Sequence, residues 1–159
     1  MLDRVDEAIL RLLENDGRLS FNSIGQEVGL SKTPSWARVN ALERDKVITA
    51  YRAEIDPARL GLQLHAFVQV TINTAKHAEF EAAVNRHGSV LECYTTAGEA
   101  DYLLHVLVPG IAELDDLLRK EISRMPGVQR QTTTVAMKTI KHRGLITDCV
   151  RSSGATAKR

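Results

Sequence analysis

The sequence lacks any apolar run that approaches the roughly 18 residues needed for a helix to cross a bilayer. Its start shows no basic flank followed by an apolar signal core. Only two cysteines occur, Cys93 and Cys149, and because they lie far apart and form no CxxC pair, neither a disulfide framework nor a thiolate metal site is expected. These absences predict a cytoplasmic protein with reduced thiols and no membrane partner.

The five histidines show neither HxH nor HExxH spacing, so no metal and no cofactor is expected. His65 and His105 fall on predicted strands, where a core or interface histidine is commoner than a metal ligand. Neither sign of charge predominates, since the net charge is +1. Charged residues make up 26% of the sequence and hydrophobic residues 43%. Such a composition is ordinary for a soluble globular protein of one or two small domains.

Residues 20–44 predict two short helices joined by a tight turn. The first helix is capped by Ser20 and ends at Gly29, which can supply a left-handed residue. Ser31 is expected to cap the second helix. Pro34 is tolerated in the first turn of that helix, because the early amides have no partner within the helix. The second helix has one narrow apolar stripe, so its other faces are free to meet another molecule.

A short turn between two amphipathic helices lets the second helix enter the major groove of double-stranded DNA. Lys32 and Arg38 suit phosphate or guanine, and Asn40 can pair with adenine. Trp36 is bulky and is expected to pack partly against its own domain. The alternative to DNA binding is that these helices form an ordinary helical hairpin inside a small domain. The predicted DNA contacts are Ser31, Lys32, Thr33, Ser35, Trp36, Arg38 and Asn40.

The charge of this region does not by itself indicate nucleic-acid binding. Residues 1–56 contain eight basic and ten acidic side chains, a net charge of −2. Residues 31–40, in contrast, contain two cations and no acid. DNA binding is therefore expected to depend on this local patch and on several copies of it.

The flanking segments favour the DNA-binding interpretation. Residues 2–13 predict a capped amphipathic helix before the pair, and residues 47–53 predict an extended segment after it. This order is typical of a winged helix-turn-helix, which we place over residues 1–53.

Several short strings in this domain resemble those of the Lrp/AsnC (feast/famine) family of transcription regulators. The strings are Leu2-Asp3-Arg4-Val5-Asp6, Leu30-Ser31-Lys32-Thr33-Pro34, Arg38-Val39, Leu42-Glu43-Arg44 and Val47-Ile48. The family usually has glycine where Lys46 stands, so Lys46 is expected either to adopt a left-handed backbone at a cost of about 1 kcal/mol or to sit in a different turn. Trp36 follows the Thr33-Pro34 pair, and this arrangement resembles the subgroup of the family that controls proline catabolism.

The second part of the chain follows a linker over residues 54–62, where Pro57 and Gly61 break the periodicity. Residues 63–142 then show the order β-α-β-β-α-β, which predicts a ferredoxin-like domain and an α+β fold class. Residues 143–159 form a C-terminal extension whose polar tail is expected to be disordered. The predicted strands cover residues 64–73, 90–96, 102–108 and 128–140, and the predicted helices cover residues 80–87 and 111–125.

The strand over residues 102–108 is apolar on both faces, so the sheet face without helices must also be covered. The simplest cover is a second copy of the same sheet. A homodimer built in this way also pairs two DNA-reading helices. The family resemblance implies further association of dimers into tetramers, octamers or larger assemblies.

The turn that contains Gly98 and Asp101 resembles the family's Gly-x-x-Asp turn, and a small effector, commonly an amino acid, lodges between dimers in that family. Gly98 would let its backbone approach a ligand carboxylate, and Asp101 would accept hydrogen bonds from a ligand ammonium group. The alternative is a hairpin in which Gly98 supplies a positive φ and Asp101 caps the turn. The resemblance adds Thr134 and Ala136 as a neighbouring wall.

These features predict a DNA-binding regulator of amino-acid metabolism, not an enzyme, whose response to an amino acid shifts its assembly and thereby its DNA geometry. Two alternatives stay open. One is a transcription regulator whose activity does not depend on a ligand. The other is a sirohaem-decarboxylase-like enzyme with a helix-turn-helix remnant, in which His65 and His105 would act on a tetrapyrrole.

Overall fold

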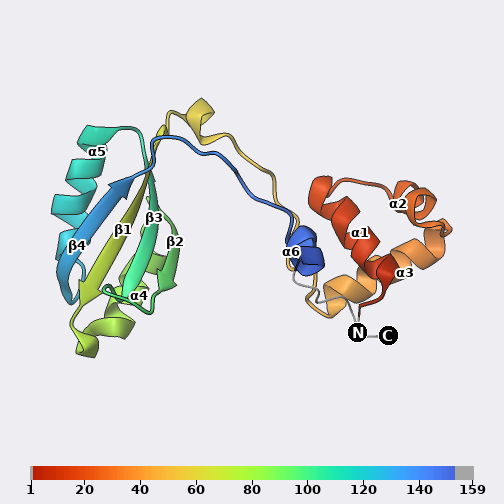
Figure 1. Cartoon of the computed structure of the whole chain (residues 1–159), viewed down its shortest axis with the longest axis horizontal. Coiled ribbons are helices and arrows are strands. Elements are labelled where there is room, and N and C mark those ends of the chain that lie inside the picture. Colours follow the sequence, from red (N-terminus) through yellow and green to blue (C-terminus); the bar gives the residue numbers. More distant parts are fainter. Residues whose placement is uncertain (1, 153–159) are drawn as a thin grey trace. The chain divides into compact units, whose positions relative to one another are not determined.

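The computed structural model describes residues 2–152 (Figure 1). The chain divides into two compact units, one formed by Met1–Glu54 with Lys141–Arg159 and the other by Ile55–Ile140. The first unit is helical, and the second contains the sheet.

Three helices form most of the first unit: α1 (Arg4–Asn15), α2 (Phe21–Val28) and α3 (Lys32–Arg44). Asp3 caps α1, since its carboxylate accepts hydrogen bonds from two backbone amides of the first turn while Asp6 bonds back to the amide of Asp3. Apolar side chains from all three helices meet in one core, whose fully buried members are Ile9, Ile24, Val39 and Leu42. The predicted helix-turn-helix is confirmed.

Two glycines shape the connection between α2 and α3. Gly29 ends α2 with φ of 72°, the left-handed conformation expected from the sequence. Gly25 has a different role, because an added Cβ there would lie 2.4 Å from the carbonyl oxygen of Leu30. The backbone can make this close approach only with glycine, and the Leu30 amide then donates to the Gly25 carbonyl over 2.8 Å.

The end of α3 also follows one of the two expected outcomes. Lys46 has φ of 58°, so it adopts the left-handed conformation that glycine would adopt without strain. The Val47 amide then donates to the Leu42 carbonyl over 2.9 Å, which closes the helix end. Residues 47–53 continue without strand pairing within the described chain, so the wing segment carries no sheet.

A short C-terminal helix, which the sequence did not predict, belongs to the same unit. This helix, α6 (Ile146–Ser152), packs against α1. The Glu14 carboxylate accepts hydrogen bonds from the Ile146 amide at 2.8 Å, the Thr147 amide at 3.1 Å and the Thr147 hydroxyl at 2.6 Å. Most of the predicted disordered tail, residues 153–159, lies outside the described residues.

The second unit is a four-stranded antiparallel sheet with the strand order β2-β3-β1-β4. The strands are β1 (Leu64–Ile72), β2 (Val90–Thr95), β3 (Tyr102–Val108) and β4 (Val128–Val135), and a 3₁₀ turn over Pro57–Leu60 precedes them. The last strand was expected to reach residue 140, which is wrong. It ends early because its partner β1 begins at Leu64, and the Ala136 amide makes the final bond to the His65 carbonyl.

The helices of this unit are α4 (His77–Asn85) and α5 (Ile111–Asp116), and α5 continues as a π turn over Leu117–Glu121 and a 3₁₀ turn over Ile122–Arg124. Both helices pack against the same face of the sheet, and their side chains share one core with β1 and β3. The largest fully buried side chains in this core are Tyr102, Phe80, Leu104 and Ile122. The ferredoxin-like prediction is confirmed.

No helix of this unit covers the other face of the sheet. Phe67 on β1 and Tyr94 on β2 are 38% and 52% exposed, although both are aromatic. His65 and His105 lie on this face, where their ring nitrogens are 3.0 Å apart and the Phe67 ring stacks on His105. The open face therefore presents an aromatic surface that a second sheet would bury.

Candidate DNA and effector sites

α3 holds one face in the core and presents the other outward. The buried side chains are Ser35, Val39 and Leu42. Lys32 and Thr33 are exposed, and Asn40 is half-buried. Trp36 is 51% exposed, so much of its ring remains on the surface while the rest packs. A helix that is anchored on one side in this way can place its opposite side in a groove.

Ser35 was predicted to contact DNA, but its side chain faces the core of the helical unit. It is completely buried, and its hydroxyl donates to the Ser31 carbonyl over 2.9 Å. It also lies against Gly25, where an added Cβ would come within 2.9 Å of its Oγ. Ser35 therefore supports the close packing of α2 on α3. Ser31 occupies the N-cap position as expected, but its side chain makes no capping hydrogen bond.

Arg38 is also not the free cation that the sequence suggested. Its Nη1 lies 2.7 Å from Asp3 Oδ2 and 2.7 Å from Asp6 Oδ1. The hydrogen bonds that Arg38 donates to Asp3, the larger cause, and to Asp6 raise the pKa of the Arg38 guanidinium. Bonds from the Asp6 amide and from Arg38 lower the pKa of Asp3. This network ties the start of α1 to α3 and neutralises Arg38 within the unit.

Sequence reasoning missed Arg44, which completes the outward face of α3. With 3.6 residues per turn, Thr33, Ala37, Asn40 and Arg44 lie opposite the buried stripe. The side chain of Arg44 is 75% exposed, and its only carboxylate partner among the described residues is the exposed Asp45, 2.9 Å away. A helical projection of the sequence would have identified it.

In the second unit, Asp101 holds the turn between β2 and β3 against β1. Its Oδ2 accepts a hydrogen bond from the Ile72 amide at 2.8 Å, beside a register shift in the β1–β4 pairing. Its amide donates to the Val70 carbonyl over 3.0 Å. Asp101 therefore has a structural role. A ligand would have to share this carboxylate with the strand.

Gly98 lies in the same turn, but neither its backbone conformation nor its surroundings within this chain require a glycine. The alternative that Gly98 supplies a positive φ is wrong, because the glycines with positive φ in residues 2–152 are Gly29, Gly61 and Gly127. An added Cβ at Gly98 would meet nothing within 4 Å. The space beside its backbone is therefore open to a partner or a ligand.

The turn and β4 meet at a small depression on the open face. Gln69, Glu99 and Arg130 line it together with Thr71, Ala100 and Thr132, and its volume is about 20 Å³. That is space for about one water molecule. Thr134 is exposed and follows Thr132 on the same face, while Ala136 lies just beyond β4. An amino acid at this position would need a wall from another chain.

No helix within residues 2–152 is long and apolar enough to cross a membrane. In the same part of the chain, no three histidine, cysteine, aspartate or glutamate side chains gather in a way that could hold a metal ion.

A helix-turn-helix joined to an α+β domain of this kind defines a DNA-binding transcription regulator with a ligand-binding domain. The sequence matches the AsnC-type helix-turn-helix domain over residues 2–43 and the Lrp/AsnC ligand binding domain over residues 65–146. The chain belongs to the Lrp/AsnC family.

Relatives and solved structures agree with this assignment. Leucine-responsive regulatory proteins from Salmonella typhimurium and Escherichia coli K12 are each 38% identical over 143 residues, covering 88% of this chain and 87% of the relative. A transcriptional regulator from Neisseria meningitidis, solved as a complex with L-Met, superposes with a TM-score of 0.88 at 30% identity, covering 91% of this chain and 96% of that chain.

Proposed function

We propose that this protein regulates transcription by reading double-stranded DNA with the outward face of α3. The observation that supports the proposal most is the division of α3 into a face fixed by Ser35, Val39 and Leu42 and an opposite face on which Thr33 and Arg44 are exposed. The proposed contacts are Ser31, Lys32, Thr33, Trp36, Asn40 and Arg44, without Ser35 and Arg38.

Two or more copies are needed for useful affinity. Residues 1–56 carry a net charge of −2, so the overall charge of a single unit does not favour DNA and its attraction depends on local cations such as Lys32 and Arg44. The open sheet face with Phe67 and Tyr94 supports a homodimer in which the two sheets cover each other. We propose that such dimers assemble further into tetramers, octamers or larger forms.

We propose that a small amino acid binds at a contact between copies, with Gly98 and Asp101 contributed by one copy and Thr134 and Ala136 by another. The L-Met complex of the Neisseria regulator and the names of the leucine-responsive relatives support this class of effector. The open space at Gly98 and the small size of the neighbouring depression support a site that a second chain completes. An effector that prefers one assembly shifts the population toward it and so changes the spacing of the α3 helices.

One observation favours a second candidate, a regulator without an effector at this turn. The Asp101 carboxylate already accepts the Ile72 amide, which is sufficient reason for an aspartate there. The enzyme alternative has less support, because His65 and His105 bond to each other and His105 Nδ1 lies 3.3 Å from Glu92. A role in proline catabolism is supported only by the tryptophan at position 36.

The test is a fluorescence-anisotropy titration of the whole chain with DNA from upstream of its own gene and with a scrambled duplex. We expect salt-sensitive binding that prefers the native duplex, and a shift of the curve with one of a panel of amino acids that includes leucine, methionine and proline. Equal affinity for both duplexes at two salt concentrations would contradict a sequence-specific regulator. A preference that no amino acid changes would select the candidate without an effector.

A further inference from the structure

A second group of exposed cations lies in the helical unit, outside α3. Lys141 and Arg143 flank His142 in the extended chain before α6, and Arg52 lies in the extended segment after α3. All three cationic residues are exposed, and none of them has a carboxylate partner among residues 2–152. We call Arg52, Lys141 and Arg143 the basic cluster.

Two contacts bring the two segments of the basic cluster together. His142 Nδ1 lies 3.0 Å from Glu54 Oε1, so the chain before α6 lies beside the segment that contains Arg52 two residues earlier. The Tyr51 hydroxyl donates to Glu43 Oε1 over 2.9 Å, which holds the same segment against the end of α3. The basic cluster therefore lies near the C-terminal end of α3.

The chain before α6 adopts a defined turn. Glu14 accepts the Ile146 amide over 2.8 Å and so fixes the start of α6. Arg143 has a left-handed backbone with φ of 47°, and the side chain of Lys141 lies over Gly144, 2.9 Å from the position of an added Cβ. The two cations are therefore presented from a fixed position on the helical unit.

The C-terminal segment also changes the sign of the charge of this unit. Residues 1–54 contain eight basic and nine acidic side chains, a net charge of −1. Residues 141–152 add three basic side chains and one acidic side chain, which brings the net charge to +1. Because attraction to DNA phosphates depends on cations, this segment offsets the acidic residues of the three helices.

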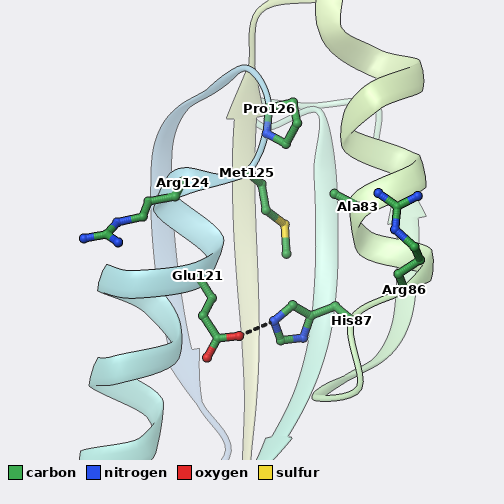
Figure 2. Close-up of a pocket in the computed structure, with 7 residues that line it drawn as sticks. All are labelled: Ala83, Arg86, His87, Glu121, Arg124, Met125 and Pro126. Carbon is green, nitrogen blue, oxygen red and sulfur yellow. Dashed lines mark hydrogen bonds and ion pairs between the residues drawn. The ribbon is translucent and has the colours of Figure 1, made fainter.

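A groove on the sheet unit does not gather cations in this way. Arg86 and Arg124 line the groove, but Arg124 points away from it and Arg86 extends from the opposite wall (Figure 2). The same groove holds the carboxylate of Glu121, whose Oε2 lies 2.7 Å from His87 Nε2. The charges of the groove are therefore separated and mixed in sign, which does not suit a row of phosphates.

We propose that the basic cluster binds backbone phosphates of the DNA beside the base pairs that α3 reads. Lysine and arginine side chains bind phosphates and position a protein on the duplex without reading its sequence. This inference rests on the proposed function, since it adds contacts to the same DNA. A segment that only connects the two units would need neither cations without carboxylate partners nor the contact between His142 and Glu54.

The test compares the double variant Lys141→Gln/Arg143→Asn with Arg119→Gln/Lys120→Gln in the anisotropy assay. Both remove two exposed cations, but Arg119 and Lys120 lie in the sheet unit. Asparagine replaces Arg143 because it tolerates a left-handed backbone. The cluster variant should bind the native and the scrambled duplex about tenfold more weakly than the control, with a salt slope reduced by about 2 and an unchanged preference between the duplexes.

Glu14→Gln tests the fixed position of the cluster. It removes an acid, which by charge alone should strengthen DNA binding. Because it also releases α6, it should instead weaken binding to both duplexes about threefold relative to Glu7→Gln, an equal change of charge on the same helix. Equal binding by Glu14→Gln and Glu7→Gln would contradict the fixed position.

The outcomes separate this inference from the proposed function. Affinities and salt slopes of the cluster variant that equal those of the control would overturn the phosphate contacts, while α3 could still read DNA. A cluster variant that also loses the preference for the native duplex would overturn them too, since phosphate contacts carry no sequence information. Equal affinity of the native chain for the two duplexes would instead contradict the proposed function alone, because phosphate contacts act on either duplex.

Discussion

Arg38 Nη1 on α3 lies 2.7 Å from Asp3 Oδ2, the N-cap carboxylate of α1, and equally close to Asp6. A basic residue on a recognition helix is usually assigned to DNA. Here it joins the start of α1 to α3 within the helical unit. The positive charge of Arg38 is therefore already paired with carboxylates in the absence of DNA.

Arg38→Gln should therefore lower the stability of the helical unit while leaving DNA affinity within about threefold at matched salt. The hydrogen bonds of Asp3 lower its pKa below 3.8, so this contribution is present at neutral pH and is lost as pH falls through the lowered pKa. Urea unfolding at neutral pH and at pH 3 measures it. If Arg38→Gln loses DNA binding but keeps its native stability, Arg38 contacts DNA and this account of its role is wrong.

Gly25→Ala should unfold the helical unit more easily, by about 1–3 kcal/mol. The added methyl would lie 2.4 Å from the Leu30 carbonyl oxygen, which is backbone and cannot rotate away. Gly88→Ala is the matched control, because nothing lies within 4 Å of its Cβ position. Equal urea midpoints for the two variants would show that α2 and α3 do not need this approach.

The contact between Glu14 and α6 should weaken in acid. Burial raises the pKa of Glu14, but the hydrogen bonds from Thr147 and Ile146 outweigh it and lower the pKa below 4.5. The contact is therefore fully present above pH 4.5 and is lost as pH falls through the lowered pKa. Amide exchange within Ile146–Ser152 should accelerate at low pH relative to α1, and Glu14→Gln should show this acceleration at neutral pH. Equal protection in both proteins would contradict the docking.

Gly98→Ala should keep the stability of the sheet unit within about 0.5 kcal/mol, because its Cβ would meet no atom of this chain within 4 Å. If a second chain or an effector approaches this backbone, the same methyl should reduce the response of DNA binding to amino acids. The DNA titration with and without leucine measures that response. An unchanged response would place the effector elsewhere.

Local patterns were sufficient to predict most elements of the fold. Alternation predicted β1, a run that is apolar on both faces predicted β3, and the glycine after α2 marked the helix end, because these signals depend on neighbours in the sequence. The left-handed Lys46 was one of two expected outcomes. Its conformation follows from the need to close α3 within two residues.

The errors arise where distant residues decide the outcome. Arg38 finds its carboxylate 35 residues earlier, and α6 is capped by a side chain 132 residues away from Ile146. Ser35 looked like a surface residue, but the close approach at Gly25 buries it. The last strand stopped early because β1 provides no further partner. No local pattern contains these contacts.

The most direct test of DNA reading by α3 compares Arg44→Ala with Arg119→Ala in the anisotropy assay. Both side chains are 75% exposed and both pair with an aspartate, but only Arg44 lies on the outward face of α3. Arg44→Ala should weaken binding to the native duplex about tenfold and reduce the salt slope by about 1, while Arg119→Ala should bind as the native chain. Equal affinities and salt slopes for the two variants would contradict the proposed recognition surface.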